Sequence, residues 1–226
     1  ENKETEDDRL LFLQPLPKSK KMIGGAAISV KQINDETMHM LELAYENVNQ
    51  AFGQLLQFSD KIDEQIYKRE DTVNYLDKVI SEYISTALAT PNLNVNISQA
   101  LSSYYLMLVD IERISDYAVN MNHQATKRLQ GDMTISEIEI VEHMKKLCVD
   151  MKNDLDDVEE AERKDDVIDS LVSSWREAQI QALKQKKCSS EVGMMLSRIF
   201  TDFERINDHA LNVSQELDKI TVEIPD

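Results

Sequence analysis

Two stretches of this chain are near copies of each other: Asp110-Ile-Glu-Arg-Ile-Ser-Asp-Tyr-Ala-Val-Asn120 and Asp202-Phe-Glu-Arg-Ile-Asn-Asp-His-Ala-Leu-Asn212. They lie 92 residues apart and are identical at seven of eleven positions. A weaker match precedes each copy, at residues 70–76 and 165–171. Self-similarity at a fixed spacing indicates that the chain is built from two similar structural units.

The composition predicts that these units are made of long helices. The 226 residues include only 5 glycines and 4 prolines, which is about 4% where an average protein has roughly 12%. Apolar residues recur at spacings of three, four and seven, as on one face of a helix. The helices expected from this pattern cover residues 26–58, 60–89, 96–129, 134–155, 158–187 and 190–220.

We therefore predict an all-α fold of two tandem, similar three-helix bundles with long antiparallel helices. The expected divisions are a charged lead-in over residues 1–25, a first unit over 26–131 and a second over 132–226. Thr134 to Glu137 has the Thr-x-x-Glu pattern of a capping box, which predicts where the second unit begins.

The charge balance excludes several classes of partner. With 42 acidic and 25 basic side chains, the formal net charge is −17, which opposes binding to nucleic acid or to an anionic membrane surface.

The longest weakly apolar run, residues 23–30, is far shorter than the ~20 residues of a membrane-spanning helix. The two cysteines, Cys148 and Cys188, are expected as free thiols, so a cytoplasmic location is predicted.

The repeated stretch places acidic residues where they repel each other. Residues four apart share a helix face, where like charges cost a few tenths of a kcal/mol. In each copy a Glu and an Asp have this spacing, and an Asn extends the row by one turn: Glu112, Asp116 and Asn120, then Glu204, Asp208 and Asn212. Carboxylate and amide oxygens suit magnesium, manganese, calcium or iron, so a bound cation is one way to offset the repulsion.

Acidic residues on the preceding helix of each unit are candidates to complete such sites. They are Glu70 and Asp71 in the first unit, and Asp165, Asp166 and Asp169 in the second. The alternative is a solvated acidic face, for which Arg113 and Arg205 are available as partners.

The two Glu-Arg-Ile-x-Asp-x-Ala-x-Asn segments resemble the repeated Glu/Asp-x-x-x-Asp signature of the PhoU family. The resemblance covers roughly residues 26–220 and implies a fold of two similar three-helix bundles. It also implies that Glu112, Asp116, Glu204 and Asp208 bind metal ions, with iron, zinc, manganese and magnesium as candidates. Asn74 stands where the second unit has Asp169, so the first site is expected to carry less charge.

The function implied by this resemblance is non-enzymatic regulation of phosphate uptake and phosphate signalling. The implied partners are the membrane component or ATPase of a phosphate transporter, and a sensor histidine kinase; assembly into a homo-oligomer stays open. Residues 9–15 resemble the linker that joins bacterial sodium/phosphate cotransporters to a C-terminal PhoU-like domain. That likeness implies a position at the inner face of the membrane.

Two other functions are weighed. A di-iron enzyme on a helical bundle needs two Glu-x-x-His motifs, and the sequence has one, Glu36-x-x-His39. A metal-free scaffold would use the acidic face to bind a basic partner. Met194, Met195 and Phe200 are interpreted as core residues, with a helix-docking surface as the alternative.

Overall fold

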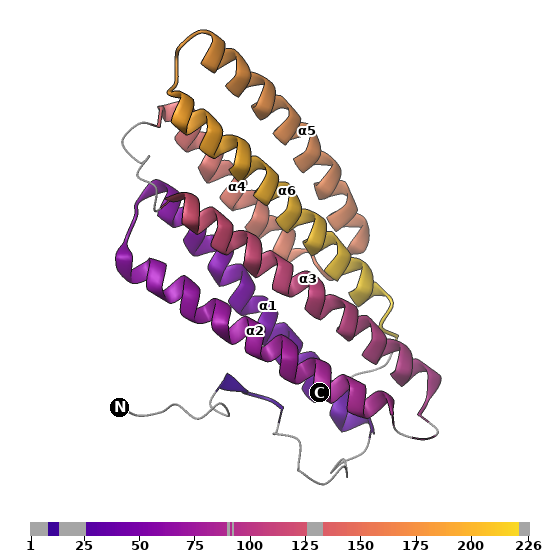
Figure 1. Ribbon diagram of the computed structural model, residues 1–226. Coiled ribbons are helices and arrows are strands. Elements are labelled where there is room, and N and C mark those ends of the chain that lie inside the picture. Colours follow the sequence, from indigo (N-terminus) through magenta and orange to yellow (C-terminus); the bar gives the residue numbers. More distant parts are fainter. Residues whose placement is uncertain (1–8, 14–25, 90, 92, 126–132, 222–226) are drawn as a thin grey trace, which may run out of the picture.

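The computed structural model describes residues 9–13, 26–89, 91, 93–125 and 133–221. Six long helices account for nearly all of these residues (Figure 1). They are α1 (Ala26–Leu56), α2 (Asp60–Leu88), α3 (Val95–Ala125), α4 (Ile135–Asn153), α5 (Val158–Lys184) and α6 (Ser190–Asp218).

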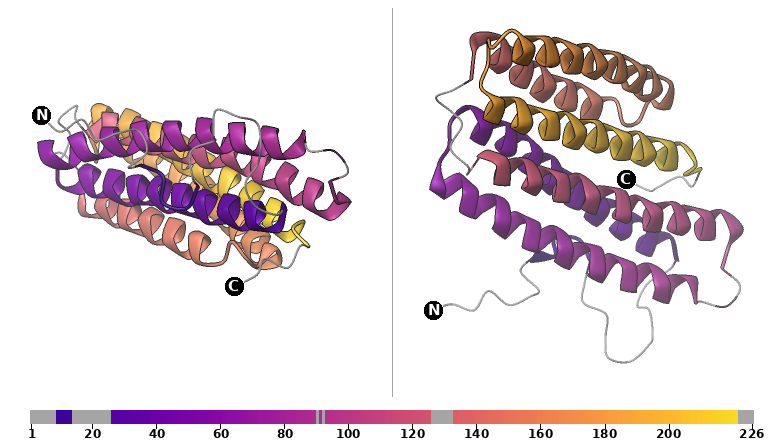
Figure 2. Two further views of the ribbon diagram at one scale, coloured as in Figure 1. Left: turned by 90° about the horizontal axis from the view of Figure 1, so that it is seen from below. Right: turned by 45° about the horizontal axis from the view of Figure 1, so that its top comes forward.

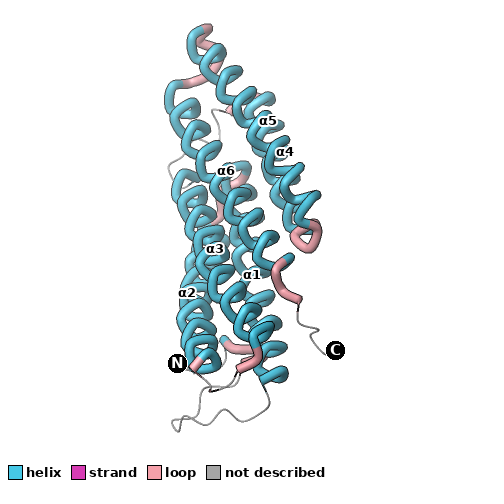
Figure 3. The backbone as a smooth tube through the Cα atoms, turned by 90° about the vertical axis from the view of Figure 1, so that its right-hand side faces the viewer, coloured by secondary structure: helices cyan, strands magenta, loops and turns pink. Residues whose placement is uncertain are grey.

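The helices lie side by side along one long axis in two groups of three (Figure 2). In the first group α1, α2 and α3 pack on one another, and in the second α5 packs along α6 with α4 beside them. The groups meet where α3 packs against α6 and α1 against α4, so α5 and α2 lie on opposite sides of the molecule (Figure 3). The predicted all-α fold of two tandem three-helix bundles is confirmed.

Local signals in the sequence explain where several helices begin and end. The predicted capping box at Thr134 and Glu137 is formed and begins α4. The side chain of Ser189 accepts a hydrogen bond from the Val192 N–H, which begins α6. α5 ends at Lys184, three residues before the predicted end, because Lys186 takes a left-handed backbone conformation with φ of 56°. Residues 126–131, where the third helix was expected to end, lie outside the described residues.

One hydrophobic core extends through both bundles. Phe52 of α1 and Phe203 of α6 are fully buried and meet edge to face, with ring centroids 6.4 Å apart. Trp175 of α5 stacks on Phe200 of α6 at 6.2 Å. Because aromatic side chains join the bundles as well as fill them, the junction between the two units is part of the core.

Residues 9–13, called the strap below, are bound to α1 by a buried carboxylate. Glu36 accepts hydrogen bonds from the backbone N–H groups of Leu11, Phe12 and Leu13, at 3.1, 2.7 and 2.9 Å. Its other oxygen lies 2.8 Å from Nδ1 of His39. Burial raises the pKa of Glu36, but the hydrogen bonds from His39 and the strap outweigh burial, so its pKa is lowered overall.

The strap accounts for the single Glu-x-x-His motif in structural terms. Leu13 is buried, Phe12 lies edge-on to the His39 ring, and the Arg9 guanidinium lies 3.7 Å from the centre of the Tyr75 ring on α2. Both polar side chains of the motif therefore take part in holding the strap. No helix in the described part of the chain is both long and apolar enough to cross a membrane.

Candidate functional site

The acidic row of the first unit comes together with a buried carboxylate of α2. Glu112 and Asp116 lie on α3, and Glu70 on α2 is only 8% exposed. The pKa of Glu70 is raised mainly by burial and further by the carboxylates of Asp116 and Glu112. The structure thus brings together three of the acidic residues predicted from the sequence.

Hydrogen bonds hold Glu70 in place. The Ser115 hydroxyl donates to one oxygen of Glu70, and the side-chain amide of Asn74 donates to the other at 3.1 Å. Ser115 accepts in turn from Asn47 of α1 at 3.0 Å, and Asn47 accepts from Arg69 of α2 at 2.8 Å. This chain of contacts links all three helices of the first bundle, and Asn74 serves in it as a hydrogen-bond donor.

Glu112 extends the first acidic face toward the junction of the bundles. Burial is the main cause of its raised pKa, and Asp116 and Asp77 raise it further, whereas Arg113 and His209 lower it. Asp77 and Ser115 were not among the predicted residues. Helical spacing could have found Asp77, which follows Glu70 and Asn74 on one face of α2; nothing in the sequence distinguishes Ser115.

The second unit gathers aspartates with fewer hydrogen bonds to offset them. Burial raises the pKa of Asp165 on α5 to about 6, with further contributions from Asp169, Asp208 of α6 and Asp166. At the position of Ser115 this unit has Asn207, whose amide donates at 2.7 Å to the Phe203 carbonyl of its own helix. The second acidic face therefore combines a half-buried carboxylate with repulsion from three neighbouring aspartates.

Arginines from the chain itself offset part of this charge. Nη1 of Arg113 lies 2.9 Å from Oδ2 of Asp116, and Nη1 of Arg205 lies 3.0 Å from Oδ2 of Asp208. Glu204 pairs with Arg176 of α5 at 2.5 Å. These pairs are partly solvent-exposed, so each contributes only about 0–1 kcal/mol to stability.

The remaining predicted residues differ in where they lie. Asp71, Asp166 and Asp169 are exposed, and Asp166 and Asp169 stand at the rim of the second cluster, where their charges raise the pKa of Asp165. Asn212 donates at 2.9 Å to Asp110 of the other bundle, so it belongs to the junction. Asn120 lines a cleft at the opposite end of that junction.

The donor chemistry of both faces is that of a hard-cation site, but the side chains as they lie do not form one. Among the residues that the structure describes, no three His, Cys, Asp or Glu side chains are grouped closely enough to hold a metal ion. Binding of a cation would require these carboxylates to move closer together. Because a cation would relieve the mutual repulsion between the aspartates of the second unit, the second unit is the more favourable of the two for cation binding.

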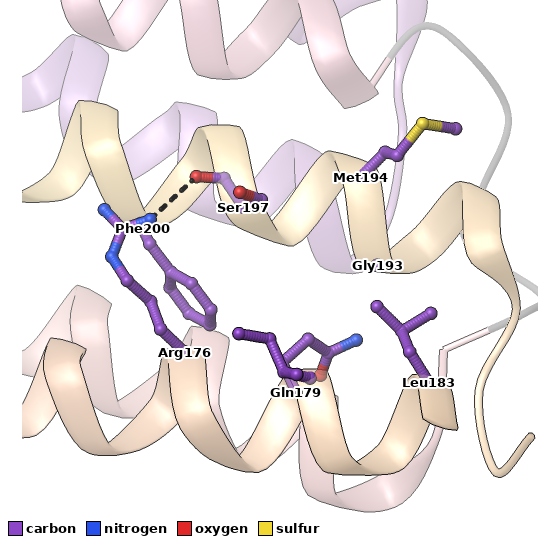
Figure 4. Close-up of a pocket in the computed structure, with 8 residues that line it drawn as sticks. Arg176, Gln179, Leu183, Gly193, Met194, Ser197 and Phe200 are labelled. Atoms are coloured by element: carbon purple, nitrogen blue, oxygen red, sulfur yellow. Dashed lines mark hydrogen bonds between the residues drawn. The ribbon is translucent and has the colours of Figure 1, made fainter. Parts of the chain in front are cut away.

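An apolar groove lies between α5 and α6, with a volume of about 360 Å³ (Figure 4). Ile180, Leu183, Met194 and Phe200 contribute its apolar walls. Arg176 closes one end, donating at 3.4 Å to the Ser197 carbonyl. Met195 and Phe200 are buried, as expected of core residues, whereas Met194 is 62% exposed.

Comparison with known proteins gives matches over most of the chain. The family model of the PhoU domain matches twice, at residues 37–125 and 135–217. A curated relative, the phosphate-specific transport system accessory protein PhoU homolog 1 of Thermotoga maritima, is 23% identical over 197 residues, which cover 82% of this chain and 84% of the relative.

Two crystal structures share the fold. PhoU from Pseudomonas aeruginosa matches with a TM-score of 0.76 and 19% identity, over 85% of this chain and 96% of the other. The phosphate transport system regulatory protein PhoU from Streptococcus pneumoniae matches with a TM-score of 0.77 and 20% identity, over 89% and 100%. At these identities the likeness concerns the arrangement of the helices.

Proposed function

The chain belongs to the PhoU family, and from that premise we propose that it regulates phosphate transport as a non-enzymatic accessory domain. The observation that carries the proposal is the double match of the family model, one match on each bundle. Each match contains one copy of the acidic repeat. The T. maritima relative is named as an accessory protein of phosphate transport, which supports the same function.

The proposed partners are the membrane component or the ATPase of a phosphate transporter, or a sensor histidine kinase, reached at the cytoplasmic face of the membrane. The six helices form an elongated body (Figure 1), which leaves long helix sides for a partner. The carboxylates of Glu112, Asp116, Glu204 and Asp208 are partly exposed along α3 and α6, which supports such a role. A docking surface for a basic partner needs no bound cofactor, so this function does not depend on metal binding.

The test is made in the organism that encodes the chain. Asp116 and Asp208 are both changed to Ala, and uptake of radioactive phosphate is measured in cells grown with scarce and with abundant phosphate. We expect the variant to lose much of the difference between the two conditions, and deletion of the chain to abolish it. Equal uptake in wild-type and deletion cells under both conditions would contradict the proposed regulation.

We further propose that the second acidic face binds a metal ion through Asp165, Asp169 and Asp208, with a weaker equivalent at Glu70, Glu112 and Asp116. Burial is the main cause of the raised pKa of Asp165, and the added repulsion from Asp169, Asp208 and Asp166 supports this order. A cation would neutralise the two acidic faces and so change what they can dock to. The candidate ions are iron, manganese, zinc and magnesium.

Element analysis of the protein after incubation with each metal tests this second proposal. The Asp116→Ala/Asp208→Ala variant should lose the bound metal, whereas Glu142→Ala, which removes an exposed acid of α4, should keep it. If the wild-type chain takes up no metal, the acidic faces act as a metal-free docking surface.

A further inference from the structure

The pair α3 and α6 has a near two-fold relation across the junction of the bundles. The helices run antiparallel, because Asp110 contacts Asn212 while Gln124, further along α3, accepts a hydrogen bond from Arg198 at 3.4 Å. Repeat-equivalent residues therefore meet at both ends of the pair. Asp110 at one end corresponds to Asp202 at the other.

The two aspartates have different surroundings. Asp110 accepts from Nδ1 of His209 at 2.7 Å and from Asn212 at 2.9 Å, so its carboxylate is bound by two side chains of the other bundle. At the equivalent of His209 the first unit has Tyr117, whose ring stacks on His209 at 5.8 Å. Asp202 thus lacks the imidazole partner that its equivalent has.

A polar cleft of about 340 Å³ opens at the Asp202 end of the junction. It is lined by residues of α3 and α6: Asn120, His123, Gln124, Ser197, Arg198, Thr201 and Asp202. Burial raises the pKa of Asp202 to about 6, although the nearby Arg198 lowers it. The space is about ten times the ~30 Å³ that one water molecule occupies in the liquid, so a small ligand can enter with some of its hydration water.

The repeat shows that this polarity belongs to one end only. Ser197, Arg198 and Thr201 line the cleft, and their equivalents in the first unit are one aromatic and two aliphatic side chains, all about half exposed: Tyr105, Leu106 and Val109. Two copies of one interface therefore differ in chemistry at the same three positions, most of all where Arg198 replaces an aliphatic side chain. The Asp202 end thus places a basic side chain beside a half-buried carboxylate that has Tyr117, and not His209, at the equivalent position.

The side chains of the cleft select the class of ligand. Arg198 supplies a positive charge, and Asn120, Gln124 and Ser197 add hydrogen-bond donors. Arg198 also disfavours a metal cation. The Asp202 carboxylate repels a fully deprotonated anion such as sulfate, but it can accept a hydrogen bond from an oxyanion that keeps a proton near neutral pH, as phosphate does.

We propose that this cleft binds a small protonated oxyanion of the phosphate class, with Arg198 as the principal donor and Asp202 as the acceptor of the ligand's O–H. The inference rests on the proposed regulation of phosphate transport and gives it a direct sensor. The ligand would contact α3 and α6 together, and so link the two bundles at the end of the junction opposite Asp110.

Calorimetric titration of the whole, chelator-treated chain at pH 7 tests the proposal, with inorganic phosphate, glycerol 3-phosphate and sulfate as the three probes. We expect phosphate to bind once per chain and sulfate not to bind. Binding of glycerol 3-phosphate in place of inorganic phosphate would identify a phosphate ester as the source of the same chemistry. Arg198→Ala should weaken binding about tenfold or more, since a charged hydrogen bond is lost.

Two further variants make the test specific. Arg163→Ala removes one positive charge from α5, far from the cleft, and should leave binding unchanged. Asp202→Asn keeps the size of the side chain and removes its charge, so sulfate should now bind. Circular dichroism checks that each variant is folded.

The proposal fails if millimolar phosphate and its ester give no heat, if Arg198→Ala binds as tightly as the wild type, or if the wild type binds sulfate and phosphate equally. None of these outcomes affects the uptake experiment with Asp116 and Asp208, because neither residue lines the cleft. The failure of a phosphate site and the failure of the regulatory function are therefore distinguishable.

Discussion

At the scale of single residues, the acidic faces differ in how their charge is tolerated. In the first unit the Glu70 carboxylate is held by hydrogen bonds from Ser115 and Asn74. In the second unit Asp165 has its pKa raised to about 6 by burial and by three neighbouring aspartates. A carboxylate whose pKa is raised by folding destabilises the folded state once it ionises.

The pH dependence of stability tests this electrostatic strain. Above its unfolded pKa of about 3.9, Asp165 binds its proton more tightly in the folded chain, so its cost to stability grows as the pH rises toward 6. At pH 8, Asp165→Asn should therefore increase the free energy of unfolding by roughly 1 kcal/mol, after allowance for solvent screening, and so raise the melting temperature. Near pH 4 the substitution should have little effect on either quantity. The exposed Asp166→Asn should have a smaller effect, and an equal gain from both variants would show that net charge alone is responsible.

The pKa of Glu36 is shifted in the opposite direction to that of Asp165. Its pKa is lowered in the folded chain, so its contribution to holding the strap is present above an unfolded pKa of about 4.3 and is lost as the pH falls through the folded value. Glu36→Ala should cost about 3 kcal/mol of stability or more, because three backbone donors lose a charged acceptor. Hydrogen exchange followed by mass spectrometry should show faster exchange of residues 11–13. Unchanged exchange there would mean that the strap is held without this carboxylate.

At the scale of secondary structure, the helices were predictable and the strap was not. Proline and glycine scarcity, apolar periodicity and the capping box at Thr134 located all six helices to within a few residues. The end of α5 was missed because Lys186 adopts a left-handed conformation that is typical of Gly or Asn. The strap has no periodic pattern, and its position depends on Glu36, which lies 23 or more residues away in the sequence.

The capping box gives a prediction for one helix. Thr134→Ala removes the side chain that accepts from the Glu137 N–H, and should destabilise the chain by about 1 kcal/mol in urea denaturation. Ser170→Ala, an exposed substitution within α5, is the matched control and should change stability by less than about 0.5 kcal/mol. Equal effects would show that the cap does not fix the start of α4.

At the scale of the whole molecule, the two bundles share one core, and this predicts a single unfolding transition. Phe203→Ala should cost about 3–5 kcal/mol, because it leaves a cavity beside Phe52 at the junction. Calorimetry should show one transition at a lower temperature. Two separate transitions, with only one of them moved, would mean that the bundles unfold independently.

The acidic clusters show how far sequence can define a site. Helical spacing placed Glu112 beside Asp116, and Glu204 beside Asp208, because neighbours on one helix follow from its period. Helical spacing could not show that Ser115 donates a hydrogen bond to Glu70, or that Asn212 binds Asp110 of the other bundle and not the carboxylates of its own helix. These contacts join different helices. The cleft around Asp202 was missed for the same reason: its lining residues come from α3 and α6, about 75 positions apart in the sequence.

The antiparallel pairing of α3 and α6 also bears on how such a protein can change in evolution. If the two units were separate, identical subunits, every substitution at one end of the junction would occur at the other end as well. Joining them in one chain removes that obligation. One end then binds its aspartate with an imidazole and an amide, while the other has Tyr117 in place of that imidazole and borders a cleft instead.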